Sequence, residues 1–338
     1  MKNPVILGIE SSCDDTSVAI IQGRKILSNI TANQNVHQKF GGVVPEMASR
    51  AHQQNIVPTL QQAILQANID KKDISAIAFT KGPGLLGSLL VGASFAKSFA
   101  MALEIPLIEV HHMQAHILAH FIEDDTMQKP NFPFLCLTVS GGHTQIVLVN
   151  DYFDMKIIGE TKDDAAGEAF DKVGKMLGLE YPAGREIDEL AKHGNPKAFP
   201  FAIPKVEEYG FSFSGIKTSV LYFLQKEIKK NPDFIRENLN DLCASVQYTI
   251  IKSLIEKLKI ASKNLQVKEV AISGGVSANS ALRKALKEEE LNGIWKAYIP
   301  KFEYTTDNAA MIALVGSLKY ERNLFTDFSA TATAKYSF

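Results

Sequence analysis

The chain of 338 residues has only three cysteines, almost no net charge and no uninterrupted apolar run long enough to cross a membrane. Cys13, Cys136 and Cys243 are far apart and form no Cys-x-x-Cys pair, which favours a reducing compartment over a disulfide framework or a cysteine metal site. The formal net charge is −1, so the overall charge of the protein does not attract it to nucleic acid or to an anionic membrane. Any polyanion must therefore be bound by a local patch or with the help of a partner.

We expect neither a targeting segment nor a membrane span. The first residues lead directly into a strand-like segment, without the apolar core of a signal peptide. The most apolar stretch, residues 85–110, is interrupted by Lys97, Glu104 and Pro106, which predicts a buried helix followed by a buried strand. We expect a cytoplasmic protein with no membrane association, long enough for two core-forming lobes.

Two histidines four residues apart, His112 and His116, form the most informative pattern in the chain. On a helix, side chains at positions i and i+4 share one face, so two imidazoles can reach one metal ion. A zinc metalloprotease has its general-base Glu directly after the first of these histidines, where this chain has Met113. The pair therefore fits a metal site without a water-activating carboxylate, or a helix face that carries two histidines with no ligand.

Three polar or glycine turns each follow a predicted buried strand. They are residues 10–15 and 140–143, which join the two strands of a hairpin, and residues 273–279, which lead into a predicted helix over 280–291. Backbone N–H groups in such turns and at helix N-termini bind phosphate without basic side chains. Each turn alone is typical of an ordinary hairpin, but all three in this order are typical of actin-like and sugar-kinase-like proteins.

Nine motifs occur in order along the chain: IESSCDDT (9–16), GGVVPEMASRAH (41–52), GPGLLGS (82–88), HHMQAH (111–116), VSGGHTQ (139–145), GEAFDK (167–172), FSFSGIK (211–217), SGGVSAN (273–279) and TDNAA (306–310). Together they closely resemble the bacterial tRNA adenosine threonylcarbamoyltransferase family. The resemblance implies an α/β, actin-like (ASKHA, RNase H-like) fold of two lobes with a nucleotide and metal cleft between them. We expect residues 1–128 to form the N-terminal lobe, with segment 310–338 packed back on it. Residues 129–309 would form the C-terminal lobe with a helical insertion.

The resemblance also implies an activity. It is the transfer of the threonylcarbamoyl group from threonylcarbamoyl-AMP to N6 of the adenosine 3′ to the anticodon, in tRNAs that read ANN codons. The implied partners are a paralogous subunit of the TsaB type and a small ATPase of the TsaE type. One divalent metal ion per subunit, Fe(2+) or Zn(2+), would be held by His112, His116 and Asp307. The implied substrate contacts are Val139, Ser140, Gly141, Gly142, His143, Asp171, Gly184, Asp188 and Asn279.

The chemistry of this donor, a mixed carbamoyl–phosphate anhydride, requires no enzyme nucleophile. Positioning and electrostatic stabilisation are its main requirements. Asp14, in the first hairpin loop, is the candidate catalytic carboxylate, whereas Cys13 fits a packed thiol better than a nucleophile. Asp171 has a structural alternative, in which it caps or pairs with residues 172–175.

Three other functions stay open from the sequence. An ATP-dependent kinase on the same fold would not need the two histidines and Asp307. A metalloprotease would need a Glu where Met113 stands. A catalytically silent scaffold could dispense with both the metal ligands and the glycine turns.

Overall fold

The computed structural model describes residues 3–34, 37 and 40–337, and it divides into two compact units. The first unit contains the chain up to Lys129 and again from Pro300 onward, and the second contains Pro130–Ile299. The chain thus re-enters the first unit at Pro300, whereas the sequence analysis placed this return at residue 310. Near this point Lys301 forms an ion pair with Asp124, in the segment that leaves the first unit.

The first unit is built on a five-stranded sheet with the order β3-β2-β1-β4-β5. Its strands are β1 (Val5–Glu10), β2 (Thr16–Gln22), β3 (Lys25–Ala32), β4 (Ala76–Gly82) and β5 (Leu107–His111). Its α-helices are α1 (Pro45–Ala67), α2 (Leu86–Leu103), α3 (His112–Leu118) and α9 (Ala309–Tyr320), with short 3-10 turns at Lys71–Asp73, Ala119–Phe121 and Phe302–Tyr304. β1 pairs antiparallel with β2 and parallel with β4, so the polar loop after β1 opens at the end of the sheet where β4 also ends.

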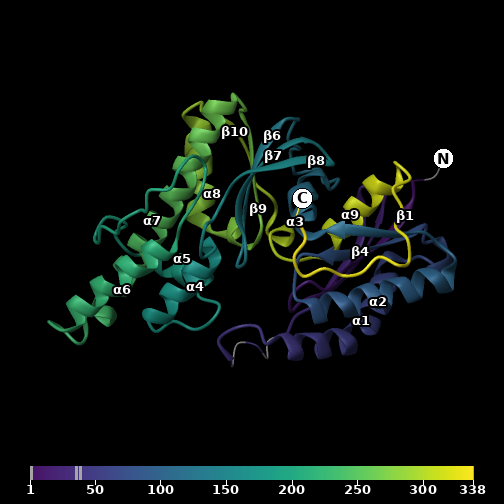
Figure 1. Ribbon diagram of the computed structural model, residues 1–338, viewed down its shortest axis with the longest axis horizontal. Helices are drawn as coiled ribbons and strands as arrows, with labels where there is room; N and C mark the ends of the chain where they lie inside the picture. Colours follow the sequence, from purple (N-terminus) through teal and green to yellow (C-terminus); the bar gives the residue numbers. More distant parts are fainter. Residues whose placement is uncertain (1–2, 35–36, 38–39, 338) are drawn as a thin grey trace. The chain divides into compact units, whose positions relative to one another are not determined.

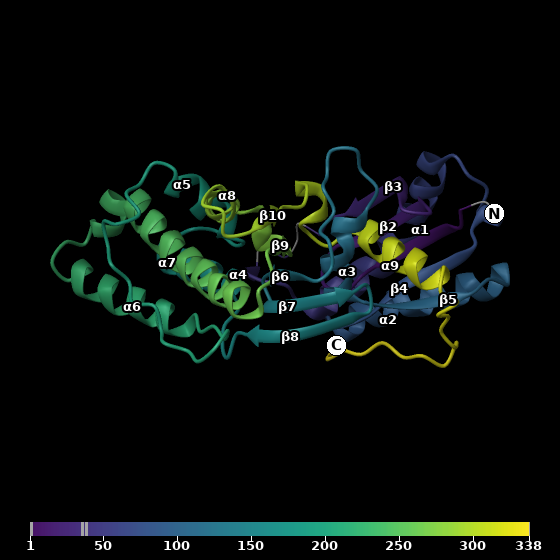
Figure 2. The same cartoon turned by 90° about the horizontal axis from the view of Figure 1, so that it is seen from above.

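Strand β1 is buried on both faces, and each face packs on different helices. Leu7 and Ile9 share one hydrophobic cluster with residues of α1 and α2. On the other face lies Gly8, at which a Cβ atom would be only 2.6 Å from the carbonyl oxygen of Ala309. The missing side chain lets the start of α9 approach the sheet closely, and Figures 1 and 2 show α9 along this face.

Helix α2 and strand β5 confirm the helix and the buried strand predicted for residues 85–110, but α2 is not a buried helix: it buries one face and exposes Leu86, Leu90 and Met101 on the other. By length and composition, α2 is the one helix in the described part of the chain that would suffice to cross a membrane. Core helices pass the same test. Its small residues serve internal contacts: a Cβ at Gly87 would meet the Ser49 hydroxyl of α1, and one at Gly92 would meet Ser11.

The second unit repeats this arrangement with the strand order β10-β9-β6-β7-β8. Its strands are β6 (Phe134–Val139), β7 (Thr144–Asp151), β8 (Asp154–Glu160), β9 (Glu269–Ser273) and β10 (Lys296–Tyr298). Its helices are α4 (Ala166–Met176), α5 (Gly184–Ala191), α6 (Ser214–Ile228), α7 (Phe234–Leu265) and α8 (Ser280–Leu291), with a 3-10 turn at Gly275–Ala278. β6 pairs antiparallel with β7 and parallel with β9, as β1 does with β2 and β4. The two predicted hairpins and the strand–Gly-Gly–helix turn are confirmed.

The segment after α9 runs back along strands β4 and β5 (Figure 1, yellow). The N–H of Thr326 donates to the Leu107 carbonyl, and that of Thr333 donates to the Lys81 carbonyl, each at 2.8 Å. The Tyr336 ring stacks on His111 with centroids 4.8 Å apart, and its carbonyl accepts from His111 Nε2 at 2.8 Å. This C-terminal segment therefore covers edge strand β5 and holds the residue directly before α3.

Candidate metal centre and substrate-binding turns

The two histidines lie on helix α3, which begins directly where β5 ends. His111 caps the helix, because its Nδ1 accepts from the N–H of Gln114 at 3.4 Å. His112 and His116 then follow at i and i+4 on one helical face, as the spacing predicted. Both are largely buried, so their orientation is fixed by packing.

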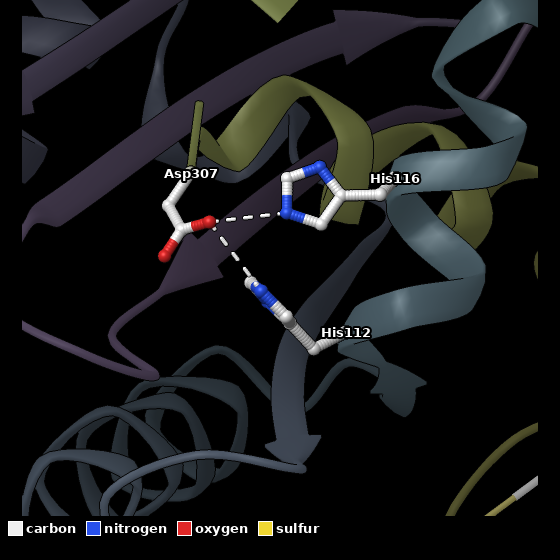
Figure 3. A group of neighbouring side chains, drawn as sticks. All are labelled: His112, His116 and Asp307. Atoms are coloured by element: carbon white, nitrogen blue, oxygen red, sulfur yellow. Dashed lines mark hydrogen bonds and ion pairs between the residues drawn. The ribbon is translucent and has the colours of Figure 1, made fainter. Parts of the chain in front are cut away.

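Asp307, far away in the sequence, lies against both histidines (Figure 3). Its Oδ1 is 3.0 Å from His116 Nε2 and 3.4 Å from His112 Nε2. One ligand atom from each of the three residues lies within 4.8 Å of the others. The neighbouring Asn308 caps α9 by accepting from the N–H of Met311 at 3.1 Å, and this fixes the backbone next to Asp307.

The three residues fit a divalent metal ion in chemistry, and the two distances to Asp307 also fit one in spacing. Imidazole nitrogen and carboxylate oxygen are ligands of Zn(2+) and Fe(2+). With bonds of about 2.0–2.1 Å and tetrahedral angles, neighbouring ligand atoms would be about 3.3 Å apart. The two distances to Asp307 Oδ1 lie close to this value. A three-residue set leaves further coordination positions for a substrate oxygen or water.

Glu10, at the end of β1, is completely buried beside His112. Its Oε2 lies 3.0 Å from His112 Nδ1. Burial alone would raise the pKa of Glu10, but the charge and hydrogen bond of His112 outweigh burial and lower it. Burial likewise opposes the charged form of His112, yet Glu10 and Asp307 together raise the pKa of His112 well above its ordinary value. His112 and the two carboxylates that face it thus favour one another's charged forms.

The loop between β1 and β2 places two further carboxylates near this cluster. Asp14, the candidate catalytic residue, is half-buried in the loop. Burial, followed by the charges of Asp14, Asp307 and Glu10, raises the pKa of Asp15 to about 7. His52 holds this loop, since its ring contacts the Thr16 hydroxyl at 2.8 Å and the Cys13 carbonyl at 3.0 Å.

In the second unit, the turn between β6 and β7 contains Ser140, Gly141, Gly142 and His143, directly after buried Val139. The Ser140 hydroxyl accepts from the N–H groups of Gly142 at 3.3 Å and His143 at 3.0 Å. These N–H groups, which the sequence analysis offered to a phosphate, are therefore used within the turn. Gly274 is in the left-handed region with φ of 83°, and its Cα lies against the Val139 carbonyl. The two glycine turns are thus in contact.

Two predicted substrate-binding carboxylates hold helix N-termini in this unit. Asp171 accepts from the N–H of Ala183 at 2.9 Å, directly before α5 and its first residue, Gly184. Asp188, on α5, accepts from the N–H and hydroxyl of Ser280 at the start of α8. The structural role found for Asp171 is therefore a contact with α5, and not the pairing with residues 172–175 that the sequence analysis considered.

Asn279 completes this group of predicted residues. Its side chain caps α8 by accepting from the N–H of Leu282 at 3.0 Å, and its Nδ2 donates to Gln247 at 2.6 Å. Hydrogen bonds thus link Asp171 to the start of α5, and Asp188 on α5 to the start of α8. Gly274, a few residues before α8, lies close to the Val139 carbonyl.

The sequence analysis missed Glu10 as a partner of His112. The available signal was an acidic residue at the end of an otherwise apolar, buried strand. The same pattern is also expected for the first residue of a polar loop, so the strand pattern alone did not predict a contact between this residue and His112.

Comparison with known sequences gives one consistent result. The profile of the family described as tRNA N6-adenosine threonylcarbamoyltransferase matches residues 25–314. A protein of that name from Riemerella anatipestifer is 68% identical over 336 residues, which cover 99% of this chain and 98% of the relative. Proteins of the same name from Christiangramia forsetii and Porphyromonas gingivalis are 65% and 55% identical, over 98% and 97% of both chains.

Solved structures with similar folds are much more distant in sequence. HypF from T. kodakarensis has a TM-score of 0.60 at 14% identity, covering 95% of this chain and 48% of HypF. Component A of (R)-2-hydroxyglutaryl-CoA dehydratase from Acidaminococcus fermentans has a TM-score of 0.55 at 15% identity, covering 94% of this chain and 99% of that protein. These likenesses concern the fold alone, and they confirm the predicted actin-like α/β class.

Proposed function

Because the chain belongs to the tRNA N6-adenosine threonylcarbamoyltransferase family, we propose that it is an acyltransferase that modifies N6 of an adenosine in tRNA. The observation that carries the proposal is the convergence of His112, His116 and Asp307 in a chain 68% identical, over nearly its whole length, to a protein of this name. A buried, preformed ligand set suits a reaction that depends on positioning and electrostatic stabilisation.

The substrates and partners form the finer part of the proposal. The donor is threonylcarbamoyl-AMP, and the acceptor is the adenosine 3′ to the anticodon in tRNAs that read ANN codons. The near-zero net charge supports shared binding of the tRNA, because this chain as a whole does not attract a polyanion. The helpers would be a TsaB-type subunit and a TsaE-type ATPase, and the reaction would take place in the cytoplasm.

The reaction joins the N6 amine to the carbamoyl carbon of the donor. The bond between that carbon and the phosphate oxygen breaks, AMP leaves with the electron pair, and the amine loses a proton. His112, His116 and Asp307 would hold one divalent ion, Fe(2+) or Zn(2+), through two Nε2 atoms and one carboxylate oxygen. When bound, the ion would supply a Lewis acid for an oxygen of the donor.

The other predicted residues would bind and orient the donor. In the second unit, Val139 to His143 would receive the nucleotide part, since no atom of that unit lies within 4 Å of a Cβ added at Gly141 or Gly142. Asp171, Gly184, Asp188 and Asn279 would contact the ribose or the threonine part of the donor. In the first unit, Asp14 would act as the catalytic or cation-organising carboxylate.

The test is a transfer assay with the purified protein, the TsaB-type and TsaE-type subunits, threonylcarbamoyl-AMP and unmodified tRNA, with threonylcarbamoyladenosine measured by mass spectrometry; a parallel reaction leaves out the two helper subunits. We expect the double variant His112→Ala/His116→Ala to lose bound metal and at least about 100-fold in rate. His193→Ala, a change at an exposed histidine of the second unit, is the control and should behave like the unchanged chain. Full activity of the metal-free double variant would contradict a metal-dependent reaction. Full activity of the isolated chain would contradict the need for helper subunits.

A further inference from the structure

The carboxylate of Glu10 has no solvent exposure, and burying an ionised carboxylate is strongly unfavourable unless its oxygens are paired. Here both oxygens are paired. Oε1 accepts from the N–H of Ser12 at 2.5 Å, and Oε2 accepts from the Thr80 hydroxyl at 2.6 Å. The remaining contact of Oε2 is His112 Nδ1, at 3.0 Å. The fold thus fixes Glu10 from two sides, and the carboxylate faces His112 on the third.

The imidazole of His112 lies between two carboxylates and uses a different nitrogen toward each. Nδ1 faces Glu10 at 3.0 Å, with the Ser12 hydroxyl farther away at 3.3 Å, and Nε2 faces Asp307. A histidine that binds a metal through Nε2 must keep its proton on Nδ1, and an acceptor at Nδ1 fixes both this tautomer and the ring orientation. Glu10 is placed to be that acceptor.

The second histidine has no such support. The Nδ1 atom of His116 is buried and has no hydrogen-bond partner among the described residues. Its ring is held by packing and by the contact of Nε2 with Asp307. Of the two imidazoles, only His112 therefore has its tautomer set by a charged acceptor.

We propose that Glu10 is a positioning residue that sets the metal affinity of this centre by holding His112 with its proton on Nδ1. The inference rests on the proposed metal centre and adds to it a residue that does not touch the ion. The competing role is purely structural, in which Glu10 only ties the end of β1 to Thr80 of β4 and to the following loop. The positioning role predicts that a neutral replacement of Glu10 weakens metal binding, whereas the structural role predicts unchanged metal affinity.

Glu10→Gln is the decisive variant because an amide cannot reproduce both sides of the carboxylate. If the amide oxygen faces His112 and Thr80, the amide NH₂ opposes the N–H of Ser12, and the negative charge is lost. If the amide is flipped, its NH₂ requires an unprotonated His112 Nδ1, and the proton then occupies the nitrogen that should bind metal. Both arrangements weaken metal binding.

The experiment measures Zn(2+) dissociation constants of metal-free protein by competition with a chromophoric chelator, together with the thermal unfolding midpoint without metal. We expect Glu10→Gln to bind Zn(2+) about 10- to 100-fold more weakly. Glu109→Gln is the matched control, because it neutralises a carboxylate of strand β5 that contacts Lys81 and the Tyr336 hydroxyl but neither metal-binding histidine, and its Zn(2+) affinity should stay within about twofold.

Each outcome decides something. Unchanged Zn(2+) affinity in Glu10→Gln with a lower unfolding midpoint would leave Glu10 a structural role only. If Glu10→Gln does not fold, Thr80→Val replaces it, since this variant frees the carboxylate on one side and should weaken Zn(2+) binding about threefold to tenfold. Unchanged affinity there would also overturn the proposal. A wild-type chain that binds no Zn(2+) would contradict the metal centre itself, which is a different failure.

Discussion

At the scale of single residues, the thiol of Cys13 is the clearest case of a reactive group that the chemistry does not need. Burial, followed by the charge of Asp14, raises the pKa of Cys13 far above its ordinary value. A thiol that stays protonated at neutral pH is a poor nucleophile. An activated anhydride donor also needs no covalent intermediate, so both arguments assign Cys13 a packing role.

We therefore expect Cys13→Ala to transfer the threonylcarbamoyl group at a rate of the same order as the unchanged chain. The rate is measured in the assay described above, and the variant is compared with Cys243→Ala, where burial raises the pKa of the thiol to about 12. A loss of more than about 100-fold in a folded Cys13→Ala, with Cys243→Ala active, would instead indicate nucleophilic catalysis.

The residues of the metal centre differ in how well the sequence predicts them. His112 and His116 follow from a local rule, because helical spacing alone brings them to one face. Asp307 comes from a family resemblance, since 191 residues separate it from His116 and no local pattern joins them. Glu10 was not predicted at all, because pairing across the sheet, and not spacing along the chain, brings it to His112.

At the scale of elements, hairpins and glycine turns were predictable because short apolar runs and turn composition are local properties. The return of the chain to the first unit was placed too late. Residues 300–308 contain only a short 3-10 turn and have no periodic pattern that would reveal their packing. Their contact with the departing segment, the ion pair of Lys301 with Asp124, joins residues 177 positions apart, and no local sequence pattern encodes it.

Helix α9 positions the third ligand of the metal centre, because Asp307 lies two residues before its first residue, Ala309. A Cβ at Gly8 would come within 2.6 Å of the Ala309 carbonyl oxygen and the Ala313 nitrogen. Gly8→Ala must therefore push α9 away from β1. We expect a loss of about 1–3 kcal/mol in the free energy of unfolding, together with weaker Zn(2+) binding.

Urea unfolding and chelator competition measure the two effects. Lys25→Ala, at the exposed start of β3 in the same sheet, is the control and should change stability by less than about 0.5 kcal/mol. Unchanged stability of Gly8→Ala would show that α9 can shift without cost, and would remove the link between this strand and Asp307.

At the scale of the whole molecule, the ion pair of Asp124 with Lys301 joins the segment that leaves the first unit to the segment that re-enters it. The hydrogen bond from Lys301, followed by those from Thr126, lowers the pKa of Asp124 to about 2. An ordinary Asp has a pKa of about 3.9 when unfolded. The ionised form therefore stabilises the fold above about pH 4, and this stabilisation is lost as the pH falls toward 2.

Asp124→Asn should accordingly lower the thermal unfolding midpoint at pH 7, and the difference from the unchanged chain should shrink at pH 3. Differential scanning calorimetry at both pH values measures it. Asp125→Asn, at the exposed neighbouring position, should have little effect at either pH. A difference for Asp124→Asn that is the same at pH 7 and pH 3 would mean that the carboxylate charge is not what stabilises the join.

The interrupted first unit also has a consequence for the order in which the protein is made. A ribosome synthesises His112 and His116 before any of the second unit, and it reaches Asp307 and α9 only after all of that unit is complete. The face of the first sheet that α9 covers stays bare during that interval, with two histidines but no third ligand. A nascent chain therefore cannot hold the ion in its final set of ligands until the second unit and Asp307 have both been synthesised.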